Sequence, residues 1–185
     1  MDIHEMNHIL RKEQDKKRYE HTQGVMYTSA ALCMRYEIDM NKGMLAGLLH
    51  DCAKCYKVKE QYALCKKHHI KLSDYEEENP SLIHAKLGSY LAETIYKVHD
   101  KDILSAIMYH TTGRPAMTTL EKIIYIADYI EPHRELPRVD EMRSLAFQNL
   151  DQTIYELAEM TLEHLSHDDK VIDASTIATY EYYKV

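Results

Sequence analysis

Six histidine and aspartate residues lie where their predicted helices otherwise place apolar side chains: His21, His50, Asp51, His84, His110 and Asp128. A single histidine on an apolar face is usually a satisfied core residue, whereas a buried carboxylate is costly unless it is paired or bound to a metal. Six such residues on five separate helices indicate a common partner. A divalent metal is the natural one, because imidazole and carboxylate together suit iron, manganese, cobalt, nickel or zinc.

The adjacent residues His50 and Asp51 are the most informative pair. Consecutive residues of a helix diverge by about 100°. This pair, however, lies near the end of its predicted helix, where a long imidazole and a two-oxygen carboxylate can converge on one site. Asp51 could also bridge two ions. Gly43 and Gly47, which precede the pair, would permit close approach by neighbouring helices. We therefore expect a metal site with one or two ions.

Such a centre would suit the hydrolysis of a phosphate anhydride. A bound divalent ion lowers the pKa of its water towards about 7, which makes a nucleophile available near neutrality. Lys54 follows the histidine–aspartate pair by one helical turn and, with Arg18 and Arg134, would stabilise charge on phosphate oxygens. His84 or His110 could hold a second ion, orient a phosphate or protonate the leaving oxygen, and the residue types do not choose among these roles.

The elements that must position these residues are predicted to be helices. The chain has only five Gly and four Pro in 185 residues, too few turn-forming residues for a sandwich or barrel. Apolar residues recur at helical spacing in nearly every stretch, so we predict an all-α fold with a polar connector over 73–80 and a charged loop between Pro132 and Pro137. The predicted helices cover about 3–13, 14–36, 40–53, 57–68, a segment that starts at Pro80 and Ser81 and carries His84, 101–110, 119–130 with a cap at Thr118 or Thr119, 139–165 and 174–183.

The length is that of one domain. We predict that residues 1–185 form a single helical bundle with the metal site in its core. Its parts are a lead helix at 3–13, a core over about 14–165 and a closing helix at about 174–183.

Charge and hydropathy exclude two classes of partner. The formal net charge is −7 and no basic stripe is present, which argues against binding to duplex nucleic acid. The longest apolar stretches are far shorter than the ~20 residues needed to span a membrane, and residues 1–6 lack the pattern of a signal peptide. The four cysteines, including the pair Cys52 and Cys55, are expected to be free thiols. We predict a cytoplasmic protein, and apolar residues near the N-terminus leave a homodimer open.

Five motifs in a fixed order carry a family resemblance: Lys17-Arg-Tyr-Glu-His21-Thr-Gln-Gly-Val25, Gly47-Leu-Leu-His-Asp-Cys-Ala-Lys54, His84, His110-Thr-Thr-Gly-Arg114 and Ile126-Ala-Asp-Tyr-Ile-Glu-Pro-His-Arg134. This pattern resembles the HD-domain superfamily of metal-dependent phosphohydrolases. Within it, the motifs look like those of the YqeK family, symmetrical bis(5'-nucleosyl)-tetraphosphatases that split diadenosine tetraphosphate into two ADP. The resemblance covers nearly the whole chain, from about Lys17 to Tyr183.

The resemblance implies a metal site and a set of catalytic residues. The implied metal ligands are His21, His50, Asp51 and Asp128, with a second metal position at Asp51, His84 and His110. The implied catalytic residues are Asp51, Lys54, His84 and His110. Iron is the ion usually associated with this family, while manganese, cobalt and nickel suit the same ligands.

The resemblance also implies a nucleotide substrate and ADP as the product. The residues expected at the nucleotide are Arg18, His21, His84, His110, Thr111, Asp128, Arg134, Asp173, Ser175 and Tyr180. Separately, the chain has 15 Tyr, and we expect Tyr180 to flank an adenine. The chain departs from the family pattern at two places. It has Asp173 and Ala174 where the family commonly has His-Pro, and His133 where a small polar residue such as Asn is expected.

Other functions fit the same residues. HD domains also include nucleotidases and phosphodiesterases that act on other nucleotides, as well as di-iron oxygenases, and this arrangement of residues is compatible with all of them. A non-catalytic module that binds a nucleotide or a metal is a further alternative. The full set of ligands argues against it, because a retired site has no chemical need for all of them.

Overall fold

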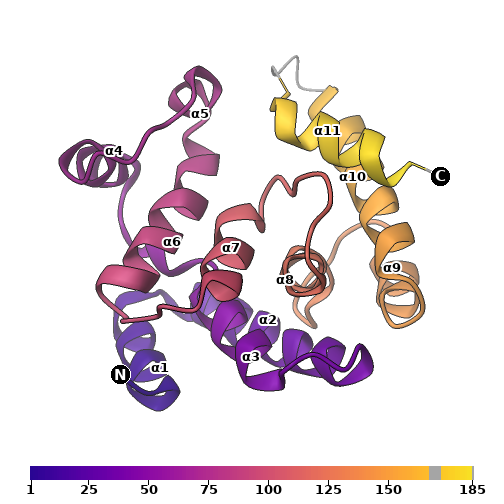
Figure 1. Cartoon of the computed structure of the whole chain (residues 1–185), viewed down its shortest axis with the longest axis horizontal. Helices are drawn as coiled ribbons and strands as arrows, with labels where there is room; N and C mark the ends of the chain where they lie inside the picture. Colours follow the sequence, from indigo (N-terminus) through magenta and orange to yellow (C-terminus); the bar gives the residue numbers. More distant parts are fainter. Residues whose placement is uncertain (167–171, 185) are drawn as a thin grey trace.

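The computed structural model describes residues 1–166 and 172–184, which form helices and their connections without any strand (Figure 1). The all-α prediction is therefore confirmed for the part of the chain that the structure describes. The helices are α1 (Ile3–Glu13), α2 (Lys16–Arg35), α3 (Met40–Leu49), η1 (Cys52–Cys55), α4 (Val58–Lys67), α5 (Asp74–Glu78), η2 (Pro80–Leu82), α6 (Ile83–Thr94), α7 (Lys101–Tyr109), α8 (Thr119–Ile130), α9 (Val139–Ala146), α10 (Leu150–Ser166) and α11 (Ala174–Tyr183).

Side-chain caps set the starts of several helices that were predicted from the sequence. The Asp15 carboxylate accepts a hydrogen bond from the Arg18 backbone N–H, so α2 begins directly after Asp15. Thr118 caps α8, rather than Thr119, because its hydroxyl oxygen accepts the Glu121 N–H. The lead helix and the closing helix have the predicted bounds. Local capping chemistry thus explains most helix boundaries.

Two segments differ from the prediction. The expected connector over 73–80 contains the helix α5, because Ser73 and Glu76 form a capping box that starts a helix. The predicted helical stretch 139–165 is divided into α9 and α10, and the Asn149 side chain accepts a backbone N–H at the start of α10. In both places a polar side chain near the helix start decides the local structure.

Helix α8 lies at the centre of the bundle, where it packs against α2, α3, α7, α9 and α10 (Figure 1). Helices α2 and α3 also pack along each other, α6 packs on α7, and α10 packs on α11. Helix α8 is accordingly apolar around much of its circumference, with Ile123, Ile124, Ile126 and Ala127 buried. A polar residue on this helix, such as Asp128, is thereby brought into the interior.

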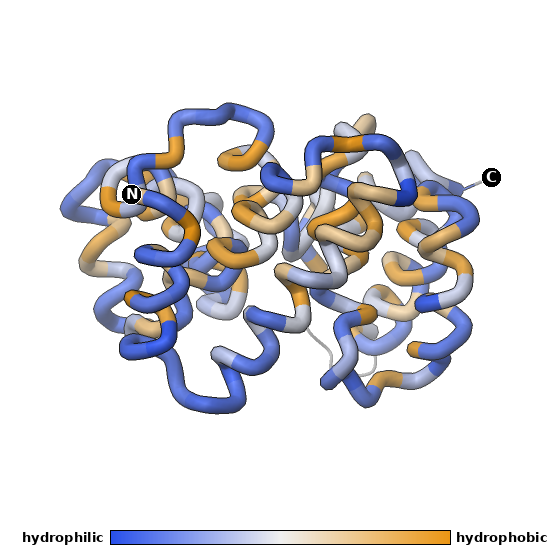
Figure 2. Tube along the Cα trace, turned by 90° about the horizontal axis from the view of Figure 1, so that it is seen from below, coloured by the Kyte–Doolittle hydropathy of each residue, from blue (hydrophilic) through white to orange (hydrophobic). Residues whose placement is uncertain are grey.

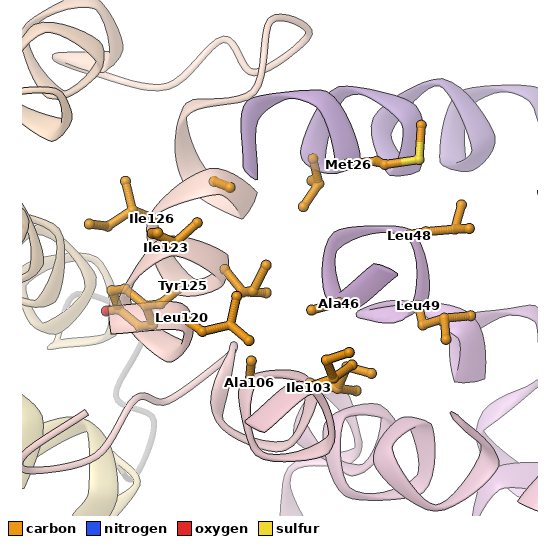
Figure 3. Packing of buried hydrophobic residues seen from close by; sticks show 14 of the residues in the cluster. Met26, Ala46, Leu48, Leu49, Ile103, Ala106, Leu120, Ile123, Tyr125 and Ile126 are labelled. Carbon is orange, nitrogen blue, oxygen red and sulfur yellow. The ribbon is translucent and has the colours of Figure 1, made fainter. Parts of the chain in front are cut away.

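Apolar side chains from α2, α3, α7 and α8 form the core around this central helix. Figure 3 shows Met26 of α2, Leu48 of α3, Ile103 of α7 and Ile123 of α8 among the buried residues of this cluster. Hydrophilic and hydrophobic stretches alternate along the chain (Figure 2), as expected for helices that bury one face. Among the described residues, none of the helices combines the length and apolar character of a membrane-spanning segment.

All four cysteines are free thiols, as predicted. Cys33, Cys52 and Cys65 are buried, and Cys55 is partly buried. Burial raises the pKa of the Cys33 and Cys55 thiols to about 11, so both stay protonated near neutral pH. The cysteines therefore act as small apolar side chains and not as nucleophilic thiolates.

Gly47 allows α2 and α3 to pack closely. A Cβ atom at this position would lie 3.0 Å from the Met26 Cα and 3.1 Å from the Val25 carbonyl oxygen. Both are backbone atoms, which cannot yield unless α2 shifts. We expect Gly47→Ala to lower the free energy of unfolding by about 1–3 kcal/mol, which urea or thermal denaturation would measure.

Gly88→Ala is the matched control for this substitution. The atom nearest to a Cβ at Gly88 is 3.5 Å away, an ordinary contact distance. Alanine is also a better helix former than glycine by about 1 kcal/mol, so this variant should keep or gain stability. Equal losses in the two variants would contradict the close-packing role of Gly47.

Candidate metal centre

The six histidine and aspartate residues singled out in the sequence lie in one cluster. They come from five elements: His21 from α2, His50 and Asp51 from the end of α3, His84 from α6, His110 from the end of α7 and Asp128 from α8. Their ring nitrogens and carboxylate oxygens form three overlapping groups, each with its donor atoms within 4.8 Å of one another. The bundle therefore brings residues that are far apart in the sequence to a single centre.

The early end of α3 lets His50 and Asp51 converge. The predicted helix over 40–53 stops directly before His50, and η1 follows after Asp51. The Asp51 backbone leaves the regular helical path, with φ −107° and ψ 18°. Both side chains are completely buried, at 0% exposure. Consecutive residues within a helix point in different directions. Because α3 ends before His50, the side chains of His50 and Asp51 can point to the same site.

Asp51 separates the cluster into two ligand groups. In the first ligand group (His21, His50, Asp128 and the Asp51 Oδ2), this oxygen lies 3.9 Å from the His21 Nε2 and 3.5 Å from the His50 Nε2. The Asp128 Oδ1 lies 3.1 Å from the His21 Nε2 and 4.0 Å from the His50 Nε2. Four side chains therefore direct donor atoms to a common point.

The second ligand group consists of His84, His110 and the other oxygen of Asp51. The Asp51 Oδ1 lies 3.3 Å from the His84 Nε2 and 3.5 Å from the His110 Nε2. One carboxylate thus faces both groups, with one oxygen directed at each.

Hydrogen bonds at the outer ring nitrogens leave Nε2 lone pairs facing the centre. The Nδ1 atoms of His50 and His110 each lie 2.7 Å from a backbone carbonyl oxygen, which can only accept, so each Nδ1 carries the proton. The His50 Nε2 lies 3.3 Å from the His21 Nε2, and the His110 Nε2 lies 3.2 Å from the His84 Nε2. Each imidazole pair therefore directs electron density towards a shared space.

These donors fit a divalent cation. The Asp51 Oδ1 is buried without a hydrogen bond among the described residues, although the Lys54 ammonium lies 3.0 Å away. Ligands bound to one ion at about 2.1 Å lie roughly 3–3.5 Å apart, close to the spacing of these atoms. Four imidazoles with two carboxylates favour transition metals and zinc over magnesium or calcium, which prefer oxygen ligands. The donor set supports a divalent metal and does not select which one.

For four of the six candidate ligands, burial and neighbouring charges favour the protonation state that a metal needs. Burial lowers the pKa of His50 to about 4, so its imidazole is neutral near pH 7. Burial and the Lys54 ammonium lower the pKa of His84 well below its usual value. Burial alone would raise the pKa of Asp51 and Asp128, but the surrounding imidazoles, together with Lys54 at Asp51 and Arg134 at Asp128, outweigh it and lower both pKa values. Neutral imidazoles and charged carboxylates are the forms that coordinate cations.

Three cationic side chains surround the carboxylates at the rim of the cluster. The Arg18 Nη1 lies 2.7 Å from the Asp51 Oδ2, and the Lys54 Nζ lies 3.0 Å from the Asp51 Oδ1. Arg134 donates to the Asp128 carboxylate, and its Nε also donates to the Asp128 carbonyl oxygen at 2.7 Å. All three side chains are partly exposed. They can therefore also contact an anion that enters from solvent.

Cavities approach the cluster beside each ligand group, through His21 at the first and through Thr111 at the second. The cavity beside the first ligand group has a volume of about 330 Å³ and is lined by Lys17, Arg18, His21, Glu131, His133 and Arg134, among others. The Thr111 Oγ1 lies 3.3 Å from the His84 Nε2 and 3.2 Å from the His110 Nε2, so Thr111 contacts the second ligand group. A cavity of about 280 Å³ there is lined by Thr111, Asp173 and Ser175, among others.

Helix α11 closes the side of the molecule that holds this second cavity. The Thr179 Oγ1 donates to the Thr112 carbonyl oxygen at 3.0 Å, which fastens α11 to the loop after α7. Tyr180 stacks on Tyr155 of α10, with ring centroids 5.3 Å apart, and lines neither of the two cavities. Its contact with an adenine stays a prediction.

Glu131 is a residue of this site that the sequence did not reveal. It ends α8 and is buried at 1% exposure, and its Oε1 lies 3.1 Å from the His21 Nδ1. The available signal was a glutamate at the end of an apolar helix, before Pro132. Glutamates at exposed helix ends show the same pattern, so the sequence alone could not distinguish the two.

Part of the chain matches the model of a known family. The model of the HD domain matches residues 18–133, a range that includes all six candidate ligands. The chain belongs to the HD-domain family. Within this HD domain the ligands come from α2, α3, α6, α7 and α8, whereas α1 and the helices α9, α10 and α11 lie outside the matched range.

Similarity to individual proteins extends beyond the HD domain. The chain is 39% identical over 173 residues to a Bacillus subtilis protein named "Bis(5'-nucleosyl)-tetraphosphatase, symmetrical", with 94% of this chain and 92% of that protein covered. A Staphylococcus aureus protein of the same name is 35% identical over 185 residues, with 99% and 95% covered. The crystal structure of a Clostridium acetobutylicum protein, described as a predicted HD superfamily hydrolase involved in NAD metabolism, superimposes with a TM-score of 0.95 at 37% identity, with 99% and 97% covered.

Proposed function

We propose that this HD-domain protein is a metal-dependent hydrolase that splits diadenosine tetraphosphate symmetrically into two ADP. The observation that supports this most is a cluster of four imidazoles and two carboxylates with three cations at its rim. It occurs in a chain that is 35% and 39% identical, over nearly its whole length, to two proteins named symmetrical tetraphosphatases.

The residues of the site divide the chemistry among them. A divalent ion held by the first ligand group, with a second position at the second group, would act as a Lewis acid and lower the pKa of a water for attack on phosphorus. Arg18, Lys54 and Arg134 bind phosphate oxygens and offset the negative charge that spreads over them in the transition state. His84 and His110 lie beside the Thr111 hydroxyl, where they would orient a phosphate or protonate the leaving oxygen if no second ion is bound.

The two cavities suit the two halves of the proposed substrate. Symmetric cleavage breaks the bond at the middle of four phosphates, so one ADP moiety must extend from the metal centre on each side. One half would lie in the cavity of Lys17 and Arg18, whose cations match its phosphates. The other would lie in the cavity of Thr111, Asp173 and Ser175, below α11.

Metal identity, location and assembly are finer proposals. Iron is the ion we propose for the site, and the same ligands accept manganese, cobalt or nickel, so elemental analysis of the purified protein decides among them. The four free thiols support a cytoplasmic location. A homodimer stays a prediction, and the exposed apolar side chains of Tyr27 and Met34 on α2 are residues that such an interface could bury.

Incubation of the metal-loaded protein with diadenosine tetraphosphate tests the proposed reaction. We expect ADP as the sole nucleotide product, separated and quantified by anion-exchange chromatography, because hydrolysis at the central anhydride gives two identical halves. In water enriched in oxygen-18, one labelled oxygen should enter each pair of ADP molecules.

Other product patterns would contradict this reaction. AMP with ATP would show asymmetric cleavage. Release of phosphate from a deoxynucleoside monophosphate, with the tetraphosphate left intact, would favour a nucleotidase. Tight binding of the tetraphosphate without turnover would favour a non-catalytic nucleotide-binding module.

A further inference from the structure

Glu131 is a buried carboxylate that the chemistry described so far does not use. It lies at the C-terminal end of α8, three residues after the ligand Asp128, and is 1% exposed. Its Oε1 lies 3.1 Å from the Nδ1 of His21. The opposite ring nitrogen of His21 faces Asp128 and His50 within the first ligand group. Among the contacts of its carboxylate, Glu131 therefore reaches the cluster through the Nδ1 of His21, the ring nitrogen that faces away from the first ligand group.

The second oxygen of Glu131 is held just as closely. Its Oε2 accepts the backbone N–H of His133 at 2.8 Å and lies 3.1 Å from the His133 Nδ1. A Cβ atom at position 24 of α2 would lie only 2.2 Å from this oxygen, so Gly24 provides the space that the carboxylate occupies. Residues of α2 and of the loop after α8 thus fix the carboxylate in one place.

The surroundings of Glu131 differ from those of a buried glutamate that serves packing alone. Glu121, on the same helix and equally buried, is neutralised by the Arg114 guanidinium at 2.9 Å. Glu131 forms no ion pair with a lysine or arginine among the described residues; the side chains that its oxygens face there are the imidazoles of His21 and His133. A carboxylate with these neighbours can influence the protonation and orientation of a histidine ring.

We propose that Glu131 is a positioning residue for the metal ligand His21. Because a carboxylate accepts and does not donate, Glu131 attracts the His21 proton to Nδ1, in competition with the Asp128 Oδ1 at the same 3.1 Å distance from Nε2. With the proton on Nδ1, the Nε2 lone pair is free for a cation in the first ligand group. The negative charge also strengthens electron donation from the imidazole, an effect that the neutral carbonyl partners of His50 and His110 do not supply to the same degree. The inference rests on the metal centre and is independent of which phosphate compound is cleaved.

Binding of Mn²⁺ to the metal-free, full-length protein tests this role. We compare the wild type with Glu131→Gln, and use Glu121→Gln as the matched control. The free ion is measured by its electron paramagnetic resonance signal. A glutamine oxygen can satisfy either His21 or His133 but not both, so we expect Mn²⁺ affinity to fall about 10–100-fold in Glu131→Gln. Glu121→Gln should stay within about twofold of the wild type, even if its unfolding temperature falls.

A second measurement separates positioning from a structural role. Nitrogen-15 spectra of the histidines in the metal-free protein should show a larger share of the His21 proton on Nδ1 in the wild type than in Glu131→Gln, where Asp128 draws the proton to Nε2. Unchanged Mn²⁺ affinity, or reduced affinity with the His21 tautomer unchanged, would overturn the proposal.

If Glu131→Gln does not fold, Gly24→Ala replaces it. Its methyl group would lie 2.2 Å from the present position of the Glu131 Oε2, so the carboxylate would have to move. Loss of Mn²⁺ affinity of the same order is expected, and wild-type affinity with a displaced carboxylate would overturn the proposal. No nucleotide is present in these titrations, so a protein that fails to cleave the tetraphosphate would refute the proposed function without affecting this inference.

Discussion

The Asp51→Ala variant is expected to lose its bound metal and at least about 1,000-fold of its hydrolytic rate while it keeps its helical fold. Asp51 directs one carboxylate oxygen at each ligand group, so its removal weakens both at once. Arg18 and Lys54, which lose their partner, are 34% and 25% exposed and can turn to solvent. Elemental analysis, a tetraphosphate assay and far-ultraviolet circular dichroism measure the three outcomes.

Two further variants control this experiment. Asp51→Asn keeps the shape of the side chain and removes its charge, so it should also lose the metal if charge is what holds the ion. Asp140→Ala removes an aspartate of α9 whose side chain is almost fully exposed and pairs with Arg143, so metal content and rate should stay at wild-type values. An Asp51→Ala protein that retains its full metal content would contradict the assignment of Asp51 as a ligand.

Removing the divalent ion with a chelator is expected to lower hydrolysis by at least about 100-fold, and adding Mn²⁺ or Fe²⁺ should restore it. Mg²⁺ should not restore it, because the first ligand group offers two imidazole nitrogens with its carboxylates, and magnesium binds nitrogen poorly. The test measures initial rates with diadenosine tetraphosphate after the chelator is removed by gel filtration and each metal is added stepwise. The additions of iron are made under anaerobic conditions.

The metal-free protein also serves as its own control for folding. Its circular dichroism should remain helical, since the core around α8 is apolar and does not depend on the ion. Full restoration by Mg²⁺ would indicate oxygen ligands and contradict the imidazole-rich centre. Undiminished activity in the metal-free protein would contradict metal-dependent hydrolysis altogether.

The sequence predicted the helices well where periodicity and caps agree. The lead helix and the closing helix follow Asp2 and Asp173, short acidic caps that precede amphipathic stretches. Helix α5 was missed because five residues are too few to show a period, although Ser73 and Glu76 carried a capping signal. The break before α10 was missed because the apolar spacing continues across it, and a single Asn149 marks the new start.

The predicted ligands could be found because charge in an apolar stripe is costly. That reasoning located His21 and Asp128 on their helices and identified His50 with Asp51 as a pair. It could not show that α3 ends before His50, because the residues around the pair continue a helical pattern. The early end is set by packing and by the His50 ring donating to a backbone carbonyl.

Residues that act through a neighbour could not be found in this way. Glu131 has no unusual spacing of its own, and its role depends on the space at Gly24 and on the position of His21 one helix away. The two cavities likewise arise from loops and helix ends that meet only in the folded chain. Such features follow from tertiary packing, which a pattern along one segment does not contain.

Anomalous diffraction from crystals of the metal-loaded protein is the most direct test of a cation at the meeting point of these helices. Data collected at the absorption edge of the bound element should give a peak about 2.0–2.3 Å from the Nε2 atoms of His21 and His50 and from oxygens of Asp51 and Asp128. A peak elsewhere in the protein, or none beside these four side chains, would contradict the account.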